Sequence, residues 1–473
     1  MVLVLTMVVL QSISFANYAL TTKTTNIIYG SAPYLTFDGG RTRVTNTEAL
    51  LGISLSDGRR FTPTTNNSSS TNPIVLPVAG QSFNDIGMLV PRNTDSIALS
   101  SLIGTPYNYW GDDDGDGQGV NGITATGSLN LSIVDKNNQA VTRNEVLTIC
   151  KAPYKLTLSN GEGRLTTRYG VPNESRFTAG NATYYIKPKA STAICFARPN
   201  VSNPNDGVSN PSKGLSAAVW VPSWGFLPQS VTPSSYGSNF PTTGANNLYF
   251  DLVIVGTNQA LSWAPVSHGG ITATMTDSSN YYYSSVQVTL RGPAVTDPNQ
   301  WYSENPRRID RPSLPQRFEL VGRDSRGNAV LKYGFVLKQW FVNRGDALGS
   351  YSRMESWCNK IGYRLSKIGD LTNATCQPRE GESQDECQGA EGATPASPDK
   401  YMRRHIGAGF FTEWGRMHAY TGANFPNRWR DYWPMKTWTG DYSFVVQQGS
   451  GNIRWLRLTQ SQYGSVTGVC VYP

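Results

Sequence analysis

Three aspartates alternate with other residues in a short run whose sequence is DDDGDG. They are Asp112, Asp114 and Asp116, and their spacing matches the start of an EF-hand calcium loop, in which alternating carboxylates point into one cage and a glycine permits the turn. The backbone oxygen of Gln118 is a candidate fourth ligand. Carboxylates this close repel one another unless a cation is present. Position twelve is Ile123 instead of glutamate, which excludes a complete EF-hand. We therefore predict a calcium-stabilised β-loop, against the alternative of a solvated acidic turn.

Aromatic and basic residues alternate near the C-terminal end of the chain, in the polar phrase PNRWRDYW. Trp429 lies there between Arg428 and Arg430, and Tyr432 follows. Tryptophan, tyrosine and arginine are enriched at binding hot spots, because the aromatic rings bury much area with few rotors. We predict a binding surface at these four residues. The alternative is that the rings belong to the core and the arginines to a solvated face.

Residues that could carry catalysis lack a supporting motif. The histidines are His268, His405 and His418, and none has a GxSxG or HExxH context. A serine or cysteine nucleophile needs a base within hydrogen-bond reach, and no phrase indicates the paired carboxylates of a glycosidase. We expect a protein that binds, not an enzyme, and a hydrolase is the least favoured interpretation.

The cysteines number six, at positions 150, 195, 358, 376, 387 and 470. An even count in an exported protein argues for disulfides, and six cysteines allow fifteen connectivities. Grouping by domain favours Cys150–Cys195, Cys376–Cys387 and Cys358–Cys470. We expect the first bridge to join two strands of one β-domain and the last to close most of the C-terminal domain. Zinc is disfavoured, because the sequence contains no CxxC pair.

The first 19 residues form an apolar run followed by small residues, as in a secretory signal segment, although no basic residue precedes the run. No later segment has about 18 uninterrupted apolar residues, so we expect no transmembrane helix. We therefore expect an exported protein, located outside the cell or on its surface. The missing basic residues indicate a wrongly assigned start or a piece of a longer chain.

Composition favours short strands joined by turns. The chain has 473 residues, which at about 150 per domain suggests three domains. It is 38% hydrophobic and 16% charged, with 46 glycines and 28 prolines, and threonine, asparagine, tyrosine and valine recur throughout. The net charge is +8, but the basic residues are mostly dispersed, so a nucleic-acid partner is disfavoured.

The chain divides into segments by its patterns. Residues 20–200 form a predicted β-rich domain, in which Leu129, Leu131 and Ile133 alternate with polar residues as in a half-buried strand. A second strand is expected to end on Cys150. Residues 201–300 are either an Ig-like β-domain or a continuation of the first domain. The proline-rich stretch 296–317 is the best domain boundary.

Residues 316–473 combine strands with helices. A hairpin is predicted around the turn Arg326-Gly327-Asn328. A helix is predicted to bury Met354, Trp357, Cys358 and Ile361 on one face and to end at Gly362, with a second short helix near Leu365, Ile368 and Leu371. Aromatic strands follow, and the last of them contains Cys470. The whole chain is therefore predicted to be mostly β, with a β-sandwich-like region before an α+β domain.

This order of a hairpin, a cysteine-bearing helix, a second helix and a terminal cysteine strand resembles the C-type-lectin-like tip of intimin and invasin. Several phrases also resemble a domain of unknown function in large enterobacterial outer-membrane adhesins: YLTFDGGRTRVTNTEALLGISLSDGRRFTPTTN, YNYWGDDDGDGQGVNGITATGSL, KYGFVLKQWFVNRGD, YRLSKIGDLTNATC and IGAGFFTEWG. The resemblance covers nearly the whole chain after the signal segment. It implies attachment to a host-cell or other surface receptor, protein or glycan, and it names no ligand.

The resemblance has two departures. The EPN, QPD and WND phrases of calcium-dependent sugar-binding lectins are absent, so we do not expect that chemistry in residues 316–473. We also find no β-barrel translocator, which the resemblance implies as a separate partner or as part of a longer chain. The alternative to a receptor-binding adhesin is a structural stalk without a discrete receptor, because fold alone does not decide between them.

Overall fold

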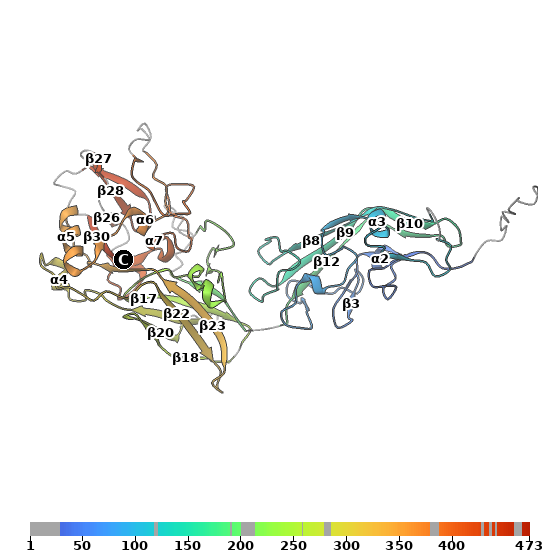
Figure 1. The fold of residues 1–473 in the computed structure, drawn as a ribbon, viewed down its shortest axis with the longest axis horizontal. Coiled ribbons are helices and arrows are strands. Elements are labelled where there is room, and N and C mark those ends of the chain that lie inside the picture. The colour runs from blue at the N-terminus through green and yellow to red at the C-terminus, as the bar shows by residue number, and fades with distance from the viewer. Residues whose placement is uncertain are drawn as a thin grey trace, which may run out of the picture. The chain divides into compact units, whose positions relative to one another are not determined.

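The structure is a computed structural model of the chain (Figure 1). It describes residues 29–117, 122–189, 192–199, 213–257, 259–278, 285–378, 387–426, 430–434, 438–439, 442–457 and 466–473. The chain divides into two compact units, Met1–Ala190 and Ser191–Pro473. Each unit has its own cluster of buried hydrophobic side chains. The predicted signal segment lies outside the described residues. The expected mostly β fold is confirmed.

The larger sheet of the first unit has five strands in the order β4-β12-β9-β8-β5. They are β4 (Ile74–Val75), β5 (Ser96–Ala98), β8 (Ser128–Val134), β9 (Tyr154–Asn160) and β12 (Gly180–Lys187). Every second side chain of β9 is buried, and β8 buries Leu129, Leu131 and Ile133 as predicted. This period of two places one face of the sheet against the core.

A second sheet of the first unit has the order β11-β10-β7. Its strands are β7 (Ile123–Thr126), β10 (Gly163–Thr167) and β11 (Glu174–Phe177). Leu165 and Phe177 from this sheet share a hydrophobic cluster with Leu129 and Leu156 from the larger sheet. Side chains of both sheets therefore fill one core, as in a β-sandwich.

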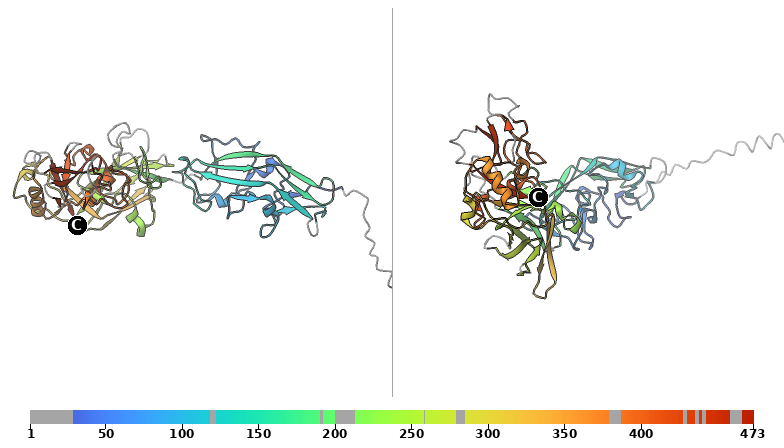
Figure 2. Two further views of the ribbon diagram at one scale, coloured as in Figure 1. Left: turned by 90° about the horizontal axis from the view of Figure 1, so that it is seen from above. Right: turned by 60° about the vertical axis from the view of Figure 1, so that its left-hand side comes forward.

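Short elements complete the first unit around this core (Figure 2). They are the paired strands β1 (Tyr34–Leu35) with β6 (Trp110–Gly111) and β2 (Ile53–Ser54) with β3 (Arg60–Phe61), the helices α2 (Thr47–Leu50) and α3 (Leu99–Ile103), and the 3-10 helix η1 (Phe83–Asp85). The strand that we predicted to end on Cys150 is wrong. Residues 141–150 instead contain turns and the isolated bridge of Val146 with Ser82, because this segment has no continuous pairing partner.

The first sheet of the second unit has seven strands in the order β14-β15-β13-β17-β21-β20-β19. They are β13 (Ala193–Arg198), β14 (Trp220–Val221), β15 (Gly225–Phe226), β17 (Leu248–Val255), β19 (Val266–His268), β20 (Ile271–Asp277) and β21 (Ser285–Arg291). A three-stranded sheet, β18 (Ser262–Trp263), β22 (Gln316–Arg323) and β23 (Ala329–Leu337), contributes Phe318 and Phe335 to the same core. The predicted hairpin is confirmed as β22 and β23, and Gly327 takes a positive φ of 84° in its turn.

The remaining sheet of the second unit has the order β16-β24-β30-β26-β28-β27, with β25 paired to β30 and β29 paired to β28. Its strands are β16 (Thr243–Ala245), β24 (Gln339–Asn343), β25 (Arg364–Leu365), β26 (Asp431–Trp433), β27 (Trp438–Thr439), β28 (Tyr442–Gln447), β29 (Ile453–Arg457) and β30 (Val466–Tyr472). Strand β16 comes from far earlier in the chain and runs parallel to β24. It therefore carries part of the segment 201–300 into the C-terminal sheet.

The second unit also contains several short helices and one longer helix. They are α4 (Pro298–Tyr302), α5 (Tyr351–Ile361), α6 (Ile368–Leu371), α7 (Phe410–Trp414) and the 3-10 helices η2 (Pro233–Ser238) and η4 (Met417–Ala419). The predicted cysteine-bearing helix is confirmed as α5. It buries Met354, Trp357, Cys358 and Ile361 and ends at Gly362, whose φ is 96°. The predicted second helix is shorter than the pattern indicated, because Leu365 lies in β25 and pairs with β30.

Disulfides close the C-terminal part as expected. Cys358 in α5 is bonded to Cys470 in β30, at a sequence separation of 112, and Cys376 is bonded to Cys387. In the loop-entropy model, a cross-link of that span stabilises the fold by about 4–5 kcal/mol. Cys150 and Cys195 are also disulfide-bonded, but they do not belong to one β-domain as we expected. Cys195 lies in β13, which pairs with β17 of the second unit.

The segment 296–317 does not separate two compact units, in contrast to our expectation. It contains α4, and Trp301 donates from Nε1 to the carbonyl oxygen of Val295 at 2.7 Å. A Cβ on Gly345 would lie 2.2 Å from the ring of Trp301. One hydrophobic cluster extends from Ala197 to Val471. Residues predicted as two domains, 201–300 and 316–473, therefore fold around one shared core.

Candidate functional site

The predicted calcium loop follows the short strand β6. Strand β6 pairs with β1, which places Gly111 opposite Tyr34. The loop then closes on itself, because the N–H of Gly117 donates to Oδ2 of Asp112 at 2.8 Å. A second segment reaches it from near the start of the described chain, where the N–H of Ser31 donates to Oδ2 of Asp114 at 2.6 Å. We call Asp112, Asp114 and Asp116 the aspartate cluster.

The structure brings the three predicted carboxylates together. One oxygen of each lies within 4.8 Å of the others. Asp116 is only 6% exposed, and neither of its carboxylate oxygens has a hydrogen-bond partner among the described residues. Oδ1 of Asp112 and Oγ of Ser31 are likewise buried without a partner there. Buried polar atoms nearly always have a partner, so these oxygens indicate a group that the described residues do not supply. The fourth predicted ligand, Gln118, lies outside the described residues.

Two glycines make room for the cluster. A Cβ at Gly30 would lie 1.4 Å from Oδ2 of Asp114, and a Cβ at Gly170 would lie 1.5 Å from Oδ2 of Asp116. Gly170 also has a φ of 93°, a backbone conformation that residues other than glycine rarely adopt. The carboxylates therefore approach the backbone of two distant segments more closely than any other residue type would allow.

Asp113 differs from its neighbours in the same run. It is exposed, forms an ion pair with Arg43 and accepts a hydrogen bond of 3.1 Å from the hydroxyl of Tyr34. The ring of Tyr34 also stacks under Arg43, with 4.8 Å from the guanidinium carbon to the ring centroid. Asp113 is therefore neutralised by this protein's own residues, whereas the aspartate cluster is not.

Electrostatic strain is concentrated on Asp112. Burial raises the pKa of Asp112 to about 6, with contributions from a hydrogen bond with Asp114 and the charge of Asp116 and against the lowering effect of the Gly117 N–H. The same hydrogen bond from Asp112, with the N–H of Ser31, lowers the pKa of Asp114. Like charges in one site disfavour full ionisation. A divalent cation would remove this penalty by neutralising all three groups.

A second buried acid, Glu413 in α7, is completely enclosed in the second unit. Its carboxylate accepts hydrogen bonds from the N–H and hydroxyl groups of Thr242 and Thr243, at 2.5 to 3.1 Å, and from the N–H of Gly407 at 2.9 Å. Burial raises the pKa of Glu413, and these donors oppose the rise. Thr243 opens β16, so Glu413 fixes this strand to α7. The residue is a structural anchor.

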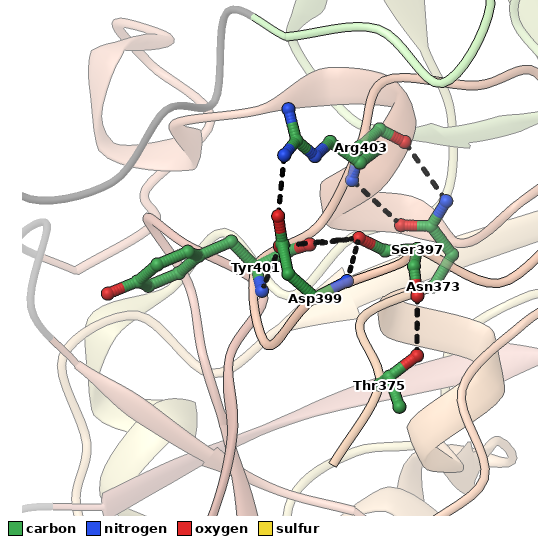
Figure 3. A network of polar contacts seen from close by, with 6 residues as sticks. All are labelled: Asn373, Thr375, Ser397, Asp399, Tyr401 and Arg403. Atoms are coloured by element: carbon green, nitrogen blue, oxygen red, sulfur yellow. Dashed lines mark hydrogen bonds and ion pairs between the residues drawn. The ribbon is translucent and has the colours of Figure 1, made fainter. Parts of the chain in front are cut away.

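Arg403 and Arg404 are also structural. Arg404 is 1% exposed, donates from Nη1 to the carbonyl oxygen of Glu413 at 2.7 Å and lies over the ring of Trp220. Figure 3 shows Arg403 in a network that joins the loop before it to the segment after α6. Asn373 exchanges two hydrogen bonds of 3.0 Å with the backbone of Arg403, whose side chain pairs with Asp399. These arginines hold the loop and do not form a charged face.

The predicted binding surface near the C-terminus is described only in part. Trp429 and Arg428 lie outside the described residues. Arg430 is half-buried. Tyr432 is completely buried, and its hydroxyl donates to Oε1 of Gln448 at 2.8 Å. Its ring therefore packs in the core and does not contribute to an exposed surface, because β26 lies inside its sheet, between β30 and β28.

Histidines come from three separate elements. His268 is exposed at the end of β19, His405 lies with Nδ1 2.8 Å from the carbonyl oxygen of Ile406, and His418 lies in η4.

None of the helices in the described ranges combines the length and the apolar character needed to cross a membrane.

Sequence reasoning missed Glu413, Gly30, Gly170 and Ser31. Glutamate in the phrase FFTEW gives one local signal, since a charged residue between buried aromatic residues needs partners inside the fold. The two glycines and Ser31 give none, because they act on carboxylates about 50 to 80 residues away in sequence.

Comparisons with known proteins found matches among solved structures. No protein-family model matches the chain, and no curated protein sequence matches it. Among solved structures, the chain is similar to invasin, a bacterial integrin-binding protein, with 13% identity over 75% of this chain and 52% of invasin and a TM-score of 0.33. It thus spans about half the length of that invasin chain.

Two structures of intimin are also similar. An intimin mutant from EHEC O157:H7 shares 13% identity over 50% of this chain and 89% of its own, with a TM-score of 0.27. Intimin-190 from enteropathogenic E. coli shares 14% identity over 50% and 90%, with a TM-score of 0.25. These likenesses are too distant to transfer the role of any residue to this chain.

Proposed function

We propose that this chain is the receptor-binding part of a surface-exposed bacterial adhesin, with Ca²⁺ held in its first unit. The observation that supports the binding role is that buried charged residues of the second unit form bonds within the fold. Glu413 and Arg404 both form hydrogen bonds that hold β16 and α7 in place. These bonds lie inside a fold closed by the Cys358–Cys470 bridge. Such a unit is a rigid scaffold for loops, and disulfides of this kind belong to exported proteins.

The proposal of a receptor as partner rests on the resemblance of the sequence to intimin, invasin and large enterobacterial adhesins. In that interpretation, the second unit presents its C-terminal loops to a host-cell or other surface receptor, and a separate outer-membrane β-barrel delivers the chain. Trp429, Arg428 and Arg430 are the proposed contact residues.

Binding to cells tests the receptor role. Labelled full-length chain should bind cultured host cells saturably, and Trp429→Ala should weaken binding by about tenfold or more, the loss expected for a tryptophan hot spot. The control is Tyr302→Ala, which removes a 55% exposed aromatic residue elsewhere on the same unit. A chain that binds cells no better than albumin would reject the adhesin proposal. Equal binding by Trp429→Ala would reject the contact residues and leave a structural stalk favoured if binding is also unsaturable.

Calcium is proposed on the chemistry of the aspartate cluster. Asp112, Asp114 and Asp116 supply hard carboxylate oxygens, and the buried hydroxyl of Ser31 is a further oxygen donor. Ca²⁺ takes 6–8 oxygen ligands in flexible geometry. When bound, it would neutralise the cluster and stiffen the loop against the segments of Ser31 and Gly170.

Calorimetric titration of the full chain tests this site. Ca²⁺ should bind once per chain, and Asp114→Asn should abolish the binding. Asp113→Asn is the matched control, because Asp113 is next in sequence but paired with Arg43. The calcium proposal fails if no heat of binding is detected, or if both variants bind as the wild type does.

A further inference from the structure

A cavity of about 450 Å³ lies in the first unit. Its volume falls in the usual range for small-molecule sites, about 300–1,000 Å³. Both apolar and polar side chains line it. We call it the tyrosine pocket. The lining residues that matter for recognition are Phe37, Arg92, Asn93, Tyr107, Tyr109 and Arg143.

Two tyrosines supply ring faces to this pocket. The rings of Tyr107 and Tyr109 lie 5.6 Å apart with 52° between their planes. Asn108 between them has a positive φ of 52°. Phe37 adds a third ring and packs against Gly87, where a Cβ would lie 2.9 Å from its ring edge. Aromatic faces of this kind bind the apolar face of a flat or cyclic ligand.

Two arginines, Arg92 and Arg143, also line the pocket. Arg143 is 7% exposed, and its Nη1 donates to the carbonyl oxygens of Val90 and Pro91 at 2.9 and 2.6 Å, which fixes its position. Its Nε is buried without a partner among the described residues, and no described group accepts from its Nη2. Arg92 is exposed and forms no ion pair within the described ranges. None of the described residues that line the pocket is acidic, so the pocket favours an anion.

Several backbone groups around the pocket are already paired. The carbonyl oxygen of Gly87 accepts from the N–H of Ser54, and both backbone groups of Tyr109 are bonded, to Leu102 and Thr36. The carbonyl oxygens of Val90 and Pro91 are held by Arg143. An extended peptide needs free backbone groups to add as a strand. The paired groups are not available for such a strand, and the polar side chains of the pocket suit a compact molecule with its own hydroxyls.

Side-chain donors and acceptors complete the pattern. The hydroxyl of Tyr107 donates to Oδ1 of Asn93 at 3.0 Å, which leaves the amide nitrogen of Asn93 as a donor. The hydroxyl of Tyr109 has no partner among the described residues. A ligand that fits must offer a carboxylate to the arginines, hydroxyls to these groups and an apolar ring face to the tyrosines.

We propose that the tyrosine pocket binds a carboxylated sugar, that is, a hexuronic or sialic acid residue of a glycan. The carboxylate accepts charge-assisted hydrogen bonds from Arg143 Nη2 and Arg92, and the C–H face of the sugar ring packs on Tyr107 and Tyr109. This site belongs to the first unit and does not depend on the receptor role of the second. It gives the chain a second, glycan-directed contact.

Calorimetric titration of the full chain in Ca²⁺-containing buffer tests the pocket. The carboxylated probes are methyl β-D-glucuronide and the methyl glycoside of N-acetylneuraminic acid. Methyl β-D-glucoside is the neutral match, and N-acetyl-aspartate amide is a carboxylate that is not a sugar. At least one carboxylated sugar should bind about tenfold or more tightly than the neutral sugar and the aspartate derivative, the discrimination expected for a charge-assisted bond.

Variants assign the binding to the pocket. Arg92→Gln should remove the preference for the carboxylated sugar, and Tyr107→Ala should weaken every sugar. Arg168→Gln, an exposed arginine of the same unit outside the pocket, should leave all affinities unchanged. Arg92 is exposed, so its variant should fold, which circular dichroism verifies. The proposal is overturned if neither carboxylated sugar binds, if the aspartate derivative binds better than both, or if Arg92→Gln and Arg168→Gln behave alike.

Discussion

The two units each enclose a carboxylate, but they treat it differently. Glu413 in the second unit accepts bonds from Thr242, Thr243 and Gly407, so its charge is met by the protein's own donors. Asp116 in the first unit is almost as deeply buried, and both of its oxygens lack a partner among the described residues. An unpaired buried charge costs several kcal/mol. A carboxylate with internal donors is thus part of the fold, whereas one without them among the described residues is a candidate ligand.

The neighbourhood of each acid supports the same distinction. Glu413 lies beside aromatic residues and fixes a strand pairing between β16 and the rest of the C-terminal sheet. Asp116 lies with two other carboxylates whose oxygens converge within 4.8 Å, and Gly30 and Gly170 give them room. The first arrangement fixes the fold of the chain, and the second gathers negative charge at one point.

The largest expected effect is the loss of the satisfied carboxylate. Glu413→Ala leaves the buried N–H groups of Thr242, Thr243 and Gly407 without an acceptor, and breaking such a site costs about 3–5 kcal/mol. We expect that decrease in the free energy of unfolding of the second unit, measured by urea denaturation, whether or not Ca²⁺ is present. Glu391→Ala removes an exposed glutamate of the same unit and should change little. A loss below about 1 kcal/mol for Glu413→Ala would contradict an anchoring role.

Next in size is a side chain placed against the unsatisfied carboxylate. Gly170→Ala should destabilise the first unit by about 2–4 kcal/mol, because strain at a φ of 93° is joined by a collision with Asp116. Gly58→Ala is the matched control, since Gly58 has a φ of 88° and a Cβ there would touch nothing. It should cost only the backbone strain, about 1 kcal/mol. Equal losses for the two variants in thermal unfolding would show that the cluster does not press on Gly170.

A smaller effect depends on pH and on Asp370 in the second unit. Burial alone would raise the pKa of Asp370, but hydrogen bonds from Arg364, the N–H of Lys367 and Gln339 lower it below 3.8. Because the folded pKa is depressed, this stabilisation is present above pH 3.8 and is lost as the pH falls through the folded value. Asp370→Asn should therefore flatten the acid limb of a plot of unfolding free energy against pH. An unchanged acid limb would remove Asp370 from the account.

The smallest effect concerns the exposed neighbour of the cluster. Asp113→Asn breaks an ion pair with Arg43 in which both side chains are about half exposed, 41% and 54%. Such pairs contribute about 0–1 kcal/mol. The melting temperature should therefore change little, and the response to Ca²⁺ should match that of the wild type. A lost calcium response in this variant would mean that Asp113, and not only the alternating residues, holds the ion.

Local patterns were enough to predict several elements. Helix α5 followed from the spacing of Met354, Trp357, Cys358 and Ile361 and from Gly362 at its end, and all of these are set within one short segment. The hairpin of β22 and β23 followed from its turn for the same reason. Alternation also placed Asp112, Asp114 and Asp116 on one side of their loop, and the structure brings their carboxylates together.

The sequence pattern does not predict pairings between residues that are far apart in the chain. Strand β16 joins the C-terminal sheet through a parallel pairing with β24 and through Glu413, about 170 residues further on, so a domain boundary at 296–317 looked plausible. The burial of Asp116 depends on Gly170, which has no local link to the aspartates. Tyr432 was placed on a surface because its neighbours are polar, but its strand lies in the middle of a sheet.

Thermal unfolding of the full chain by differential calorimetry, with Ca²⁺ or with a chelator, tests the central distinction most directly. A ligand at 100 times its dissociation constant stabilises the folded state by about 2.7 kcal/mol. The account predicts that Ca²⁺ raises the transition of the first unit by several degrees and leaves that of the second unchanged, and that Asp116→Asn removes the shift. Identical scans with Ca²⁺ and chelator, or a shift that survives in Asp116→Asn, would contradict the view that the unpaired carboxylates await a cation.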